Sequence, residues 1–249
     1  MAPRASGGSG TRQLRRVSTL FEGLSEAEVA ALVAELPRRQ VARGTYLLRA
    51  GDSADCHSSP ASSAYLILDG MVKIYGPSED GKLVLLALAG PGELVGEMGA
   101  IERAAPSADV VALDRCTVLP IPQHTLRSWI RSPILAANLM RLLSRRLRST
   151  SAQVRVLITL DVYKRVARQL LSLAADYGVD LQGRRTLPFA LTQEDLAAMV
   201  GAERPTVSTV INAFKDQGLI EVGAGRRIAI LDPARLAVAR KPPPDTRER

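Results

Sequence analysis

The chain has 249 residues, of which 46% are hydrophobic and 23% charged, and its formal net charge is +8. This length fits one large or two moderate domains, and the composition is typical of a globular protein with a hydrophobic core. No run of about 18 uncharged apolar residues is present, which argues against a membrane-spanning helix, and the N-terminus lacks the apolar centre of a secretory signal. We therefore expect a cytoplasmic protein.

The positive charge is unevenly distributed along the chain. Residues 1–18 carry four arginines and no acidic residue, and residues 137–160 carry five arginines and no acidic residue. Residues 19–136 carry 10 Lys or Arg against 14 Asp or Glu, and residues 161–236 carry 10 against 9. Net charge by itself therefore does not predict nucleic-acid binding, although a basic protein invites that hypothesis.

The two ends of the chain lack any apolar periodicity, so residues 1–18 and 237–249 are predicted to be disordered tails. The first helix is predicted to begin after Ser25, because Ser25 can cap it and Glu28 completes a capping box; Pro37 ends it. Its apolar stripe consists of Val29, Leu32, Val33 and Leu36.

From about residue 40 to residue 122 the pattern changes to short β runs separated by glycines. The predicted strands are residues 46–49, 64–68, 71–75, 82–88, 109–113 and 116–121. Many short strands at a spacing of roughly 8–12 residues predict a barrel, roll or jelly roll. The polar segment 52–63 is predicted to be an exposed loop.

A long helix is predicted from Pro133 to about Leu160, with Ser132 as its N-cap. A helix of about 28 residues is about 42 Å long, more than a monomer of this size needs. Its arginines restrict it to one apolar seam, so it is either a long core helix or, as we expect, a coiled-coil dimerisation helix. The seam residues are Leu135, Leu139, Leu142, Leu143, Leu147, Val154, Leu157 and Leu160.

The remaining segments predict a helix–turn–helix followed by a basic wing. Asp161 caps a helix that ends near Asp176 and marks the expected hinge between the two halves of the chain. A short strand is predicted over residues 187–191. Two short helices then follow, a capped one over residues 192–200 and a second over residues 203–217. A glycine-tipped hairpin from Leu219 to Ile230 closes the fold.

In a helix–turn–helix the second helix places its N-terminal side chains in the major groove of DNA. Arg204 can donate two hydrogen bonds to guanine, and short polar side chains suit phosphates. A structural helical hairpin with solvated polar residues is the alternative, but the added wing favours DNA binding. The predicted DNA-binding residues are Thr192, Gln193, Glu203, Arg204, Thr206, Ser208, Thr209, Asn212, Arg226 and Arg227.

This order of parts, a glycine-rich β-roll, a long helix and a winged helix–turn–helix, resembles the cyclic-AMP receptor protein/FNR (CRP/FNR) family of transcription regulators over about residues 19–231. The resemblance implies an α+β fold with a double-stranded β-roll sensor (19–132), a dimerisation helix (133–160) and a C-terminal DNA-binding domain (161–236). It also implies a homodimer that binds pseudo-palindromic double-stranded DNA, and RNA polymerase as a further partner.

The segment Pro91–Ala100 resembles the phosphate-binding cassette of that family. By this resemblance Gly96 is a backbone donor, and Glu97 accepts from a ribose 2′-hydroxyl. Cyclic-nucleotide binders place an arginine and then a small residue further along, where this chain has Pro106 and Ser107. The arginine that neutralises the cyclic phosphate is therefore missing.

Other positions of the chain match cyclic-AMP responders. Arg146, Thr150 and Ser151 correspond to positions around the adenine, and Arg103 lies close enough to Ser107 in the sequence to substitute for the phosphate arginine. Two alternatives stay open: a roll that binds cyclic AMP or another cyclic nucleotide, or an effector-independent regulator with a degenerate pocket.

The sequence lacks the residues that other kinds of sensor or an enzyme would need. The two cysteines, Cys56 and Cys116, are too few for the four ligands of an iron–sulfur cluster, and Cys56-His57 lies on a polar loop unsuited to haem. The two histidines, His57 and His124, are too few for a cupin-like metalloenzyme. We expect no haem, no cluster, no metal and no catalytic set.

In its recognition helix the sequence departs from the best-known family members. Arg204 matches the guanine-reading arginine, but Pro205 occupies a position that is often glutamate, and Thr209 occupies a second arginine position. Proline is tolerated in a first helical turn, so the helix is still expected. The operator should differ from that of the cyclic-AMP receptor protein.

Overall fold

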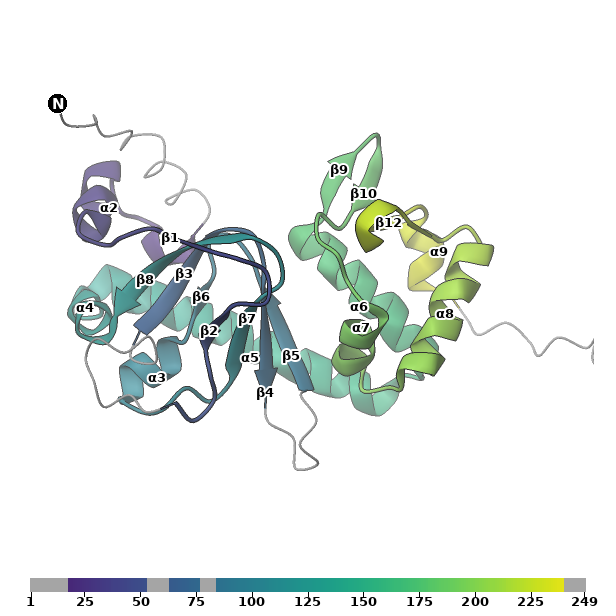
Figure 1. The fold of residues 1–249 in the computed structure, drawn as a ribbon, viewed down its shortest axis with the longest axis horizontal. Coiled ribbons are helices and arrows are strands. Elements are labelled where there is room, and N and C mark those ends of the chain that lie inside the picture. The colour runs from purple at the N-terminus through teal and green to yellow at the C-terminus, as the bar shows by residue number, and fades with distance from the viewer. Residues whose placement is uncertain (1–17, 53–62, 77–83, 240–249) are drawn as a thin grey trace, which may run out of the picture. The chain divides into compact units, whose positions relative to one another are not determined.

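The computed structural model describes residues 18–52, 63–76 and 84–239. The chain divides into two compact units, residues 1–149 and 150–249, each of which we describe on its own (Figure 1). The basic tail up to residue 17, the Cys56-His57 pair and the tail from residue 240 lie outside the described residues. Within the described ranges, no helix is both long enough and apolar enough to cross a membrane.

The first unit begins with a 3-10 turn, η1 (Thr19–Phe21), and helix α2 (Glu26–Val33). The predicted capping box is present, because Ser25 Oγ accepts from the Glu28 backbone N–H at 3.3 Å and Glu28 Oε2 accepts from the Ser25 N–H at 2.7 Å. Ser18, assigned to the tail from sequence, is buried and caps η1.

A β-roll of two antiparallel sheets follows, as predicted. Its strands are β1 (Arg39–Val41), β2 (Tyr46–Leu48), β3 (Ser63–Asp69), β4 (Val72–Gly76), β5 (Val84–Ala89), β6 (Leu94–Val95), β7 (Asp109–Ala112) and β8 (Cys116–Pro122). The sheet orders are β1-β8-β3-β6 and β2-β7-β4-β5. Strands β1 and β6 were not predicted, because three or two residues are too few to show a periodicity.

Strand β3 separates two hydrophobic cores. Because side chains alternate along a strand, Tyr65 and Ile67 face the core between the two sheets, whereas Ala64 and Leu66 face a core formed with the helices. The second core is covered by short helices α3 (Glu97–Glu102) and α4 (Gln123–Trp129). Neither helix was predicted, and neither has an N-cap side chain that hydrogen-bonds to its first turn.

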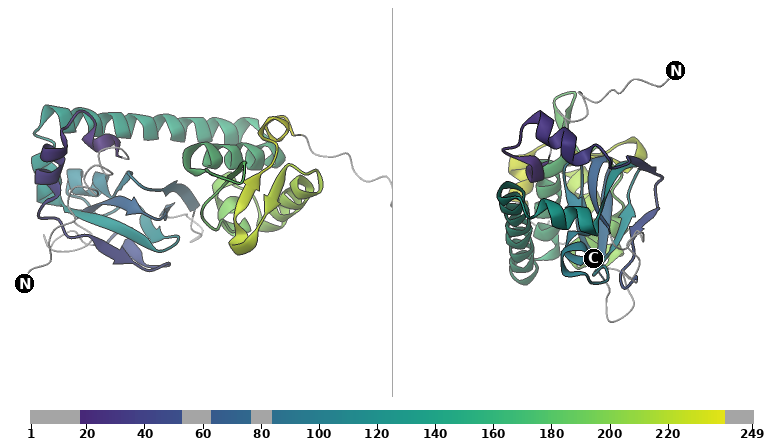
Figure 2. Two further views of the ribbon diagram at one scale, coloured as in Figure 1. Left: turned by 90° about the horizontal axis from the view of Figure 1, so that it is seen from above. Right: turned by 90° about the vertical axis from the view of Figure 1, so that its left-hand side faces the viewer.

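Helix α5 (Pro133–Thr159) is uninterrupted (Figure 2). Its first turns belong to the core of the roll: Leu135 and Leu139 are buried, and the buried amide of Asn138 donates to the carbonyl oxygens of Leu20 at 3.0 Å and Glu22 at 2.7 Å. The core-helix interpretation is therefore confirmed for this part of α5.

Further along α5 a second apolar face is exposed. It consists of Met140 (62% exposed), Leu147 (69%), Val154 (49%) and Ile158 (78%), which we call the α5 seam. The first three recur every seven residues, the spacing of one side of a coiled coil. The single seam expected from the sequence is thus two faces, one buried by the roll and one uncovered.

The second unit contains a helix–turn–helix and a four-stranded sheet. Its helices are α6 (Val162–Tyr177), α7 (Gln193–Val200), α8 (Arg204–Asp216) and α9 (Pro233–Ala237). The sheet order is β11 (Ile220–Val222), β12 (Ile228–Ile230), β10 (Arg184–Thr186) and β9 (Val179–Leu181). As predicted, Asp161 caps α6, and its Oδ1 accepts from the Lys164 N–H at 2.9 Å.

The strand predicted over residues 187–191 is wrong. The strand is β10, which ends at Thr186 and pairs with β9 and β12, while the following segment is irregular. The apolar alternation of this segment reflects burial in the core of Leu187, Phe189 and Leu191. Pro188 lacks a backbone N–H, so it cannot donate to a neighbouring β-strand.

Helices α6 and α8 of this unit pack against each other through aromatic side chains. The rings of Tyr163 on α6 and Phe214 on α8 lie edge to face with centroids 4.6 Å apart. At the C-terminal end, α9 includes residue 237, and Ala239 is buried at 9% exposure. The folded part therefore extends three residues into the predicted tail.

Candidate effector and DNA-binding sites

Gly96 directly precedes helix α3, and the fold requires a glycine at this position. Its backbone is left-handed, with φ of +75°, and a Cβ atom there would lie 2.4 Å from Leu48 Cδ1 and 3.1 Å from the Ser63 carbonyl oxygen. Any other residue would strain the left-handed backbone and displace the Leu48 side chain. The glycine thus holds the residue that follows it, Glu97, inside the roll.

Glu97 is the first residue of α3 and its side chain is almost completely buried, with 1% exposed. Arg146 of α5 reaches it: Arg146 Nη1 lies 2.5 Å from Glu97 Oε1, and Nη2 donates to the Leu94 carbonyl oxygen at 2.7 Å. The guanidinium therefore binds both a side chain and the backbone of the cassette.

The second carboxylate oxygen, Glu97 Oε2, is buried and has no hydrogen-bond partner among the described residues. Burial raises the pKa of Glu97, and the positive charge of Arg146 opposes that rise by favouring the ionised form. Buried polar atoms are almost always hydrogen-bonded, so an unsatisfied acceptor fits a donor supplied from outside, such as a hydroxyl or an N–H group.

Pro106, at the position where the family resemblance leads one to expect the phosphate arginine, is buried, and its carbonyl oxygen accepts from the Gly51 N–H at 2.9 Å. Ser107 next to it is exposed. Arg103 follows α3 in a left-handed conformation, with φ of 59°, and its side chain is exposed. Residue 106 therefore offers an apolar ring and no positive charge.

Of the six residues predicted to bind an effector, the structure brings Glu97 and Arg146 into direct contact, next to Gly96. Thr150 and Ser151 follow Arg146 by about one turn of α5 and are exposed. The sequence did not predict the Glu97–Arg146 ion pair, because the partners are 49 residues apart and no local signal links them. Among the described residues no cluster of His, Cys, Asp and Glu could hold a metal ion.

Helix α7 is capped, as the sequence predicts, and the cap is a capping box formed by Thr192 and Asp195. Thr192 Oγ1 donates to Asp195 Oδ2 at 2.6 Å and accepts from the Asp195 N–H at 3.0 Å. The hydroxyl proton of Thr192, predicted to bind phosphate, is thus committed to the cap. Gln193 is the first helical residue and is half-buried.

Helix α8 has the two faces that the sequence predicts. Its buried face, Val207, Val210, Ile211 and Phe214, packs inside the unit. The predicted DNA-reading side chains lie on the other face, where Arg204, Thr206, Thr209 and Asn212 are exposed; Ser208 is half-buried. Glu203 is the exposed N-cap residue, and Pro205 stands in the first turn without interrupting the helix.

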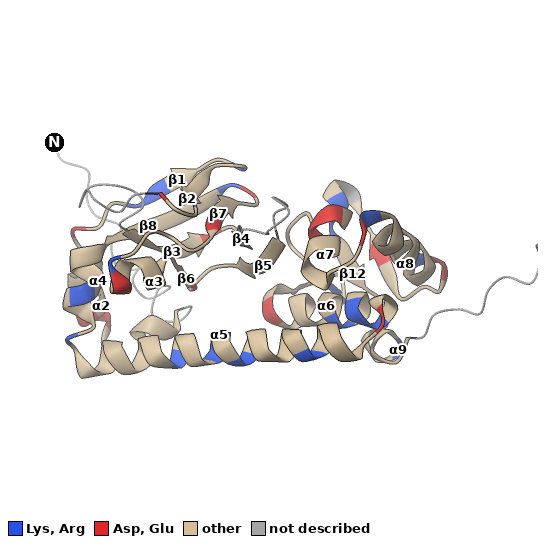
Figure 3. Cartoon of the chain, turned by 90° about the horizontal axis from the view of Figure 1, so that it is seen from below, with Lys and Arg blue, Asp and Glu red and all other residues tan. Residues whose placement is uncertain are grey.

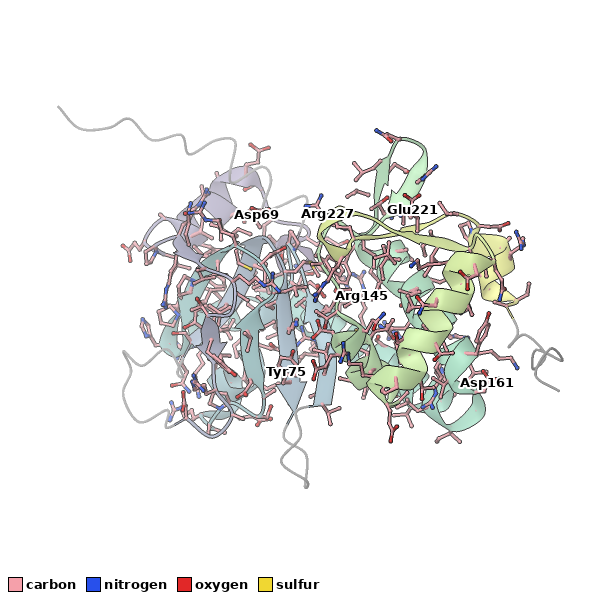
Figure 4. The ribbon with its side chains drawn as sticks, turned by 45° about the vertical axis from the view of Figure 1, so that its right-hand side comes forward. Asp69, Tyr75, Arg145, Asp161, Glu221 and Arg227 are labelled. Carbon is pink, nitrogen blue, oxygen red and sulfur yellow. The ribbon has the colours of Figure 1, made fainter. Side chains whose placement is uncertain are left out.

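The wing is the hairpin of β11 and β12. Its turn contains η3 (Ala224–Arg226), and both Arg226 and Arg227 are exposed. Figure 4 labels Arg227 on this hairpin. The left-handed backbone of Arg226, with φ of 61°, helps to reverse the chain within the tip. The wing therefore presents two positive charges on a short turn.

A cleft of about 470 Å³ lies between the start of α7, helix α8 and the wing. It brings together predicted DNA-binding side chains from three elements, because Thr192 and Gln193, Arg204, and Arg226 all line it. The sequence could not predict the cleft, which is also lined by Ile211 and Ile228. The full lining is Leu191, Thr192, Gln193, Glu194, Leu196, Arg204, Ile211, Val222, Arg226 and Ile228.

Helix α5 is also electrostatically distinct, since it carries five arginines and no acidic residue (Figure 3). Arg141 lies 3.8 Å from the Glu22 carboxylate, and Arg145 donates to Thr19 Oγ1 at 3.1 Å. Together with Arg146 these contacts attach the N-terminal segment and the cassette to the same helix.

Comparisons with known proteins agree with this arrangement. Residues 38–132 match the cyclic nucleotide-binding domain family, and residues 164–239 match the Crp-like helix-turn-helix domain family. A CRP-like cAMP-activated global transcriptional regulator from Mycobacterium tuberculosis is 33% identical over 219 residues, which cover 88% of this chain and 94% of the relative.

The cyclic AMP receptor protein of Thermus thermophilus is also 33% identical, over 220 residues that cover 86% of this chain and 95% of that protein. Among solved structures, a transcriptional regulator of the CRP/FNR family, also from Thermus thermophilus, superposes with a TM-score of 0.65 at 26% identity. That superposition covers 82% of this chain and 100% of the other.

Replacing Arg146 by alanine should destabilise the first unit by about 2 kcal/mol near pH 7.5, because a buried carboxylate loses its partner while the arginine itself is one-third exposed. Without Arg146 the pKa of Glu97 rises further. The loss is therefore present above that raised pKa and shrinks as the pH falls through it and the carboxyl becomes neutral.

Urea unfolding followed by the fluorescence of Trp129, the single tryptophan of the chain, measures this loss at pH 7.5 and pH 5. Arg148→Ala, at an exposed position two residues along α5, is the matched control and should change stability by less than about 0.5 kcal/mol. A pH-independent loss would contradict the assignment of the ion pair.

Proposed function

The chain belongs to the CRP/FNR family of transcription regulators, and from this we propose that it acts as a homodimer whose roll responds to a small effector and whose α8 reads a pseudo-palindromic DNA site. The observation that carries the proposal is the convergence of Thr192, Gln193, Arg204 and Arg226 on one open cleft. A structural hairpin with solvated polar residues needs no such convergence from three separate elements.

Each part of this surface has its own task in DNA binding. Arg204, the first residue of α8, donates to guanine O6 and N7, which carries sequence information. Gln193 and the backbone N–H groups of the first turn of α7 bind phosphate, since the Thr192 hydroxyl serves the cap. Arg226 and Arg227 bind phosphate or the minor groove from the wing.

Dimerisation is supported by the α5 seam. Four large apolar side chains lie uncovered on one helix, an arrangement that a second copy of the same helix would bury. Paired helices would place the two recognition helices about 34 Å apart, one turn of B-DNA, which is the spacing that a pseudo-palindromic operator requires.

The effector hypothesis rests on Glu97. Its buried Oε2 lacks a partner, and a ribose 2′-hydroxyl of a cyclic nucleotide has the donor that this oxygen accepts. Relatives at 33% identity include a cAMP-activated regulator and a cyclic AMP receptor protein, which supports the same class of ligand. Gly96, Ser107, Arg146, Thr150 and Ser151 complete the proposed ligand-binding set.

A second candidate is a regulator that needs no effector, and Pro106 favours it. A cyclic phosphate carries a full negative charge, and the described cassette offers it a buried proline ring at the position where family members have arginine. In this case the Glu97–Arg146 ion pair would fasten α5 to the roll, and the regulator would be controlled by its abundance or by a protein partner.

We also propose that the chain is cytoplasmic, has no enzymatic activity and contacts RNA polymerase when bound to DNA. The relatives are transcription regulators, which supports all three statements. A cupin-like metalloenzyme would need a cluster of ligands, and none lies in the part of the chain that the structure describes.

Cyclic AMP or cyclic GMP at millimolar concentration should raise the melting temperature of the protein, with a stabilisation of about 2.7 kcal/mol when the ligand is at 100 times its Kd. Glu97→Ala should abolish the rise, because the acceptor is gone. Glu102→Ala, at the other end of α3 and exposed, is the control and should keep it. The absence of any shift in the wild type would establish the second candidate instead.

Leu147→Asp should convert the dimer into a monomer of 26.7 kDa. Two leucines, one from each copy, lose their burial, so dimerisation should weaken at least about 100-fold. Size-exclusion chromatography with light scattering measures the mass. Arg148→Asp places the same carboxylate one residue along on a different face of α5 and should remain dimeric; a monomeric wild type would refute the proposal.

Arg204→Ala should weaken binding to an operator selected from a random duplex pool by about 1–3 kcal/mol and relax the choice at one base pair, because a bidentate contact is lost. Arg227→Ala should weaken binding to operator and random DNA alike and lower the salt dependence. Anisotropy titrations at two salt concentrations separate the two effects. Equal losses on both DNAs for Arg204→Ala would show that Arg204 touches only phosphate.

A further inference from the structure

We propose that Thr209 is a specificity-determining residue that reads the 5-methyl group of one thymine in each operator half-site, through its own methyl group. The inference rests on the proposed insertion of α8 into the major groove. It adds a base contact that the guanine-reading role of Arg204 does not include.

The side-chain hydroxyl of Thr209 is committed within the helix. Thr209 Oγ1 donates to the carbonyl oxygen of Pro205, one turn earlier, at 3.1 Å. A threonine hydroxyl has a single proton, so Thr209 has no donor left for guanine O6 or N7 or for thymine O4. An arginine at this position would have donated to guanine, and Thr209 as observed cannot.

What Thr209 presents outward is its methyl group. The residue is exposed in the second turn of α8, on the face opposite the buried Val207 and Val210. Because Oγ1 is turned back along the helix toward residue 205, the Cγ2 methyl is the exposed end of the side chain. In the major groove, the thymine methyl is the one base group that an apolar side chain recognises.

Pro205 strengthens this apolar surface. Residues 205 and 209 are four apart and therefore neighbours on the same face of α8, and the proline ring is exposed. Proline has neither a side-chain hydrogen-bonding group nor a backbone N–H to offer a base. The proline ring and the Thr209 methyl group form one small apolar surface next to Arg204. This surface suits a thymine adjacent to the guanine that Arg204 reads.

The test uses the full chain and an operator duplex selected by the wild-type protein from a random pool. Each thymine of one half-site is replaced in turn by deoxyuridine, which removes only the 5-methyl group. Kd is measured by anisotropy for the wild type, Thr209→Ser and Thr209→Val. Serine keeps the hydroxyl and loses the methyl, whereas valine keeps a methyl and loses the hydroxyl.

One deoxyuridine substitution should weaken wild-type binding about fourfold, the value of one buried methyl-sized group. Thr209→Val should keep that sensitivity. Thr209→Ser should bind the thymine operator about fourfold more weakly and become indifferent to the substitution. Thr159→Ser, the same change at an exposed threonine of α5 whose hydroxyl also donates to the carbonyl oxygen one turn earlier, is the control and should leave the sensitivity at this thymine unchanged.

Other outcomes overturn the inference. Equal deoxyuridine sensitivity in the wild type and Thr209→Ser would show that another residue reads the methyl, and loss of discrimination in Thr209→Val would assign the contact to the hydroxyl oxygen. A half-site without thymine would also refute it while leaving the proposed function intact. If the wild type selects no sequence at all, sequence-specific binding itself fails.

Discussion

Helix α5 carries apolar side chains on two different faces, and the rest of the structure depends on what buries each of them. Its first turns are held in the roll by Leu135, Leu139 and the two carbonyl contacts of Asn138. Beyond them, the α5 seam from Met140 to Ile158 stays uncovered. A helix with apolar residues on two faces is stable only if each face is buried by something, and the proposed second copy of the chain buries the second face.

The ion pair of Arg146 and Glu97 adds an electrostatic contact to the apolar packing between α5 and the roll. Arg146, seven residues after Leu139, lies on the roll-facing side of α5 and binds the cassette through a carboxylate and a backbone oxygen. A ligand that satisfied Glu97 Oε2 would act on the same carboxylate that holds α5. An effector changes the balance between two conformations only through such a differential contact, and this pair offers one between the ligand and the proposed dimerisation helix.

Local signals were sufficient for much of the fold. The capping box of Ser25 and Glu28, the cap at Asp161 and the two faces of α8 all depend on residues within a few positions of one another, and all are confirmed. The errors have a common cause. The alternation of Leu187, Phe189 and Leu191 resembles a strand, but it reflects burial in an irregular segment, and strands β1 and β6 are stabilised by pairing with distant strands that a local pattern does not reveal.

The sequence by itself determined the order of the parts and the helix that carries Arg204 on its exposed face, because these follow from short-range pattern. It also showed a proline, Pro106, at the position where the family resemblance leads one to expect the phosphate arginine. Only the tertiary structure decided which oxygen of Glu97 is satisfied, that the Thr209 hydroxyl is committed to the backbone, and that the apolar seam of α5 is two faces. These depend on contacts between segments far apart in the chain, or on side-chain rotamers, and neither is encoded in spacing.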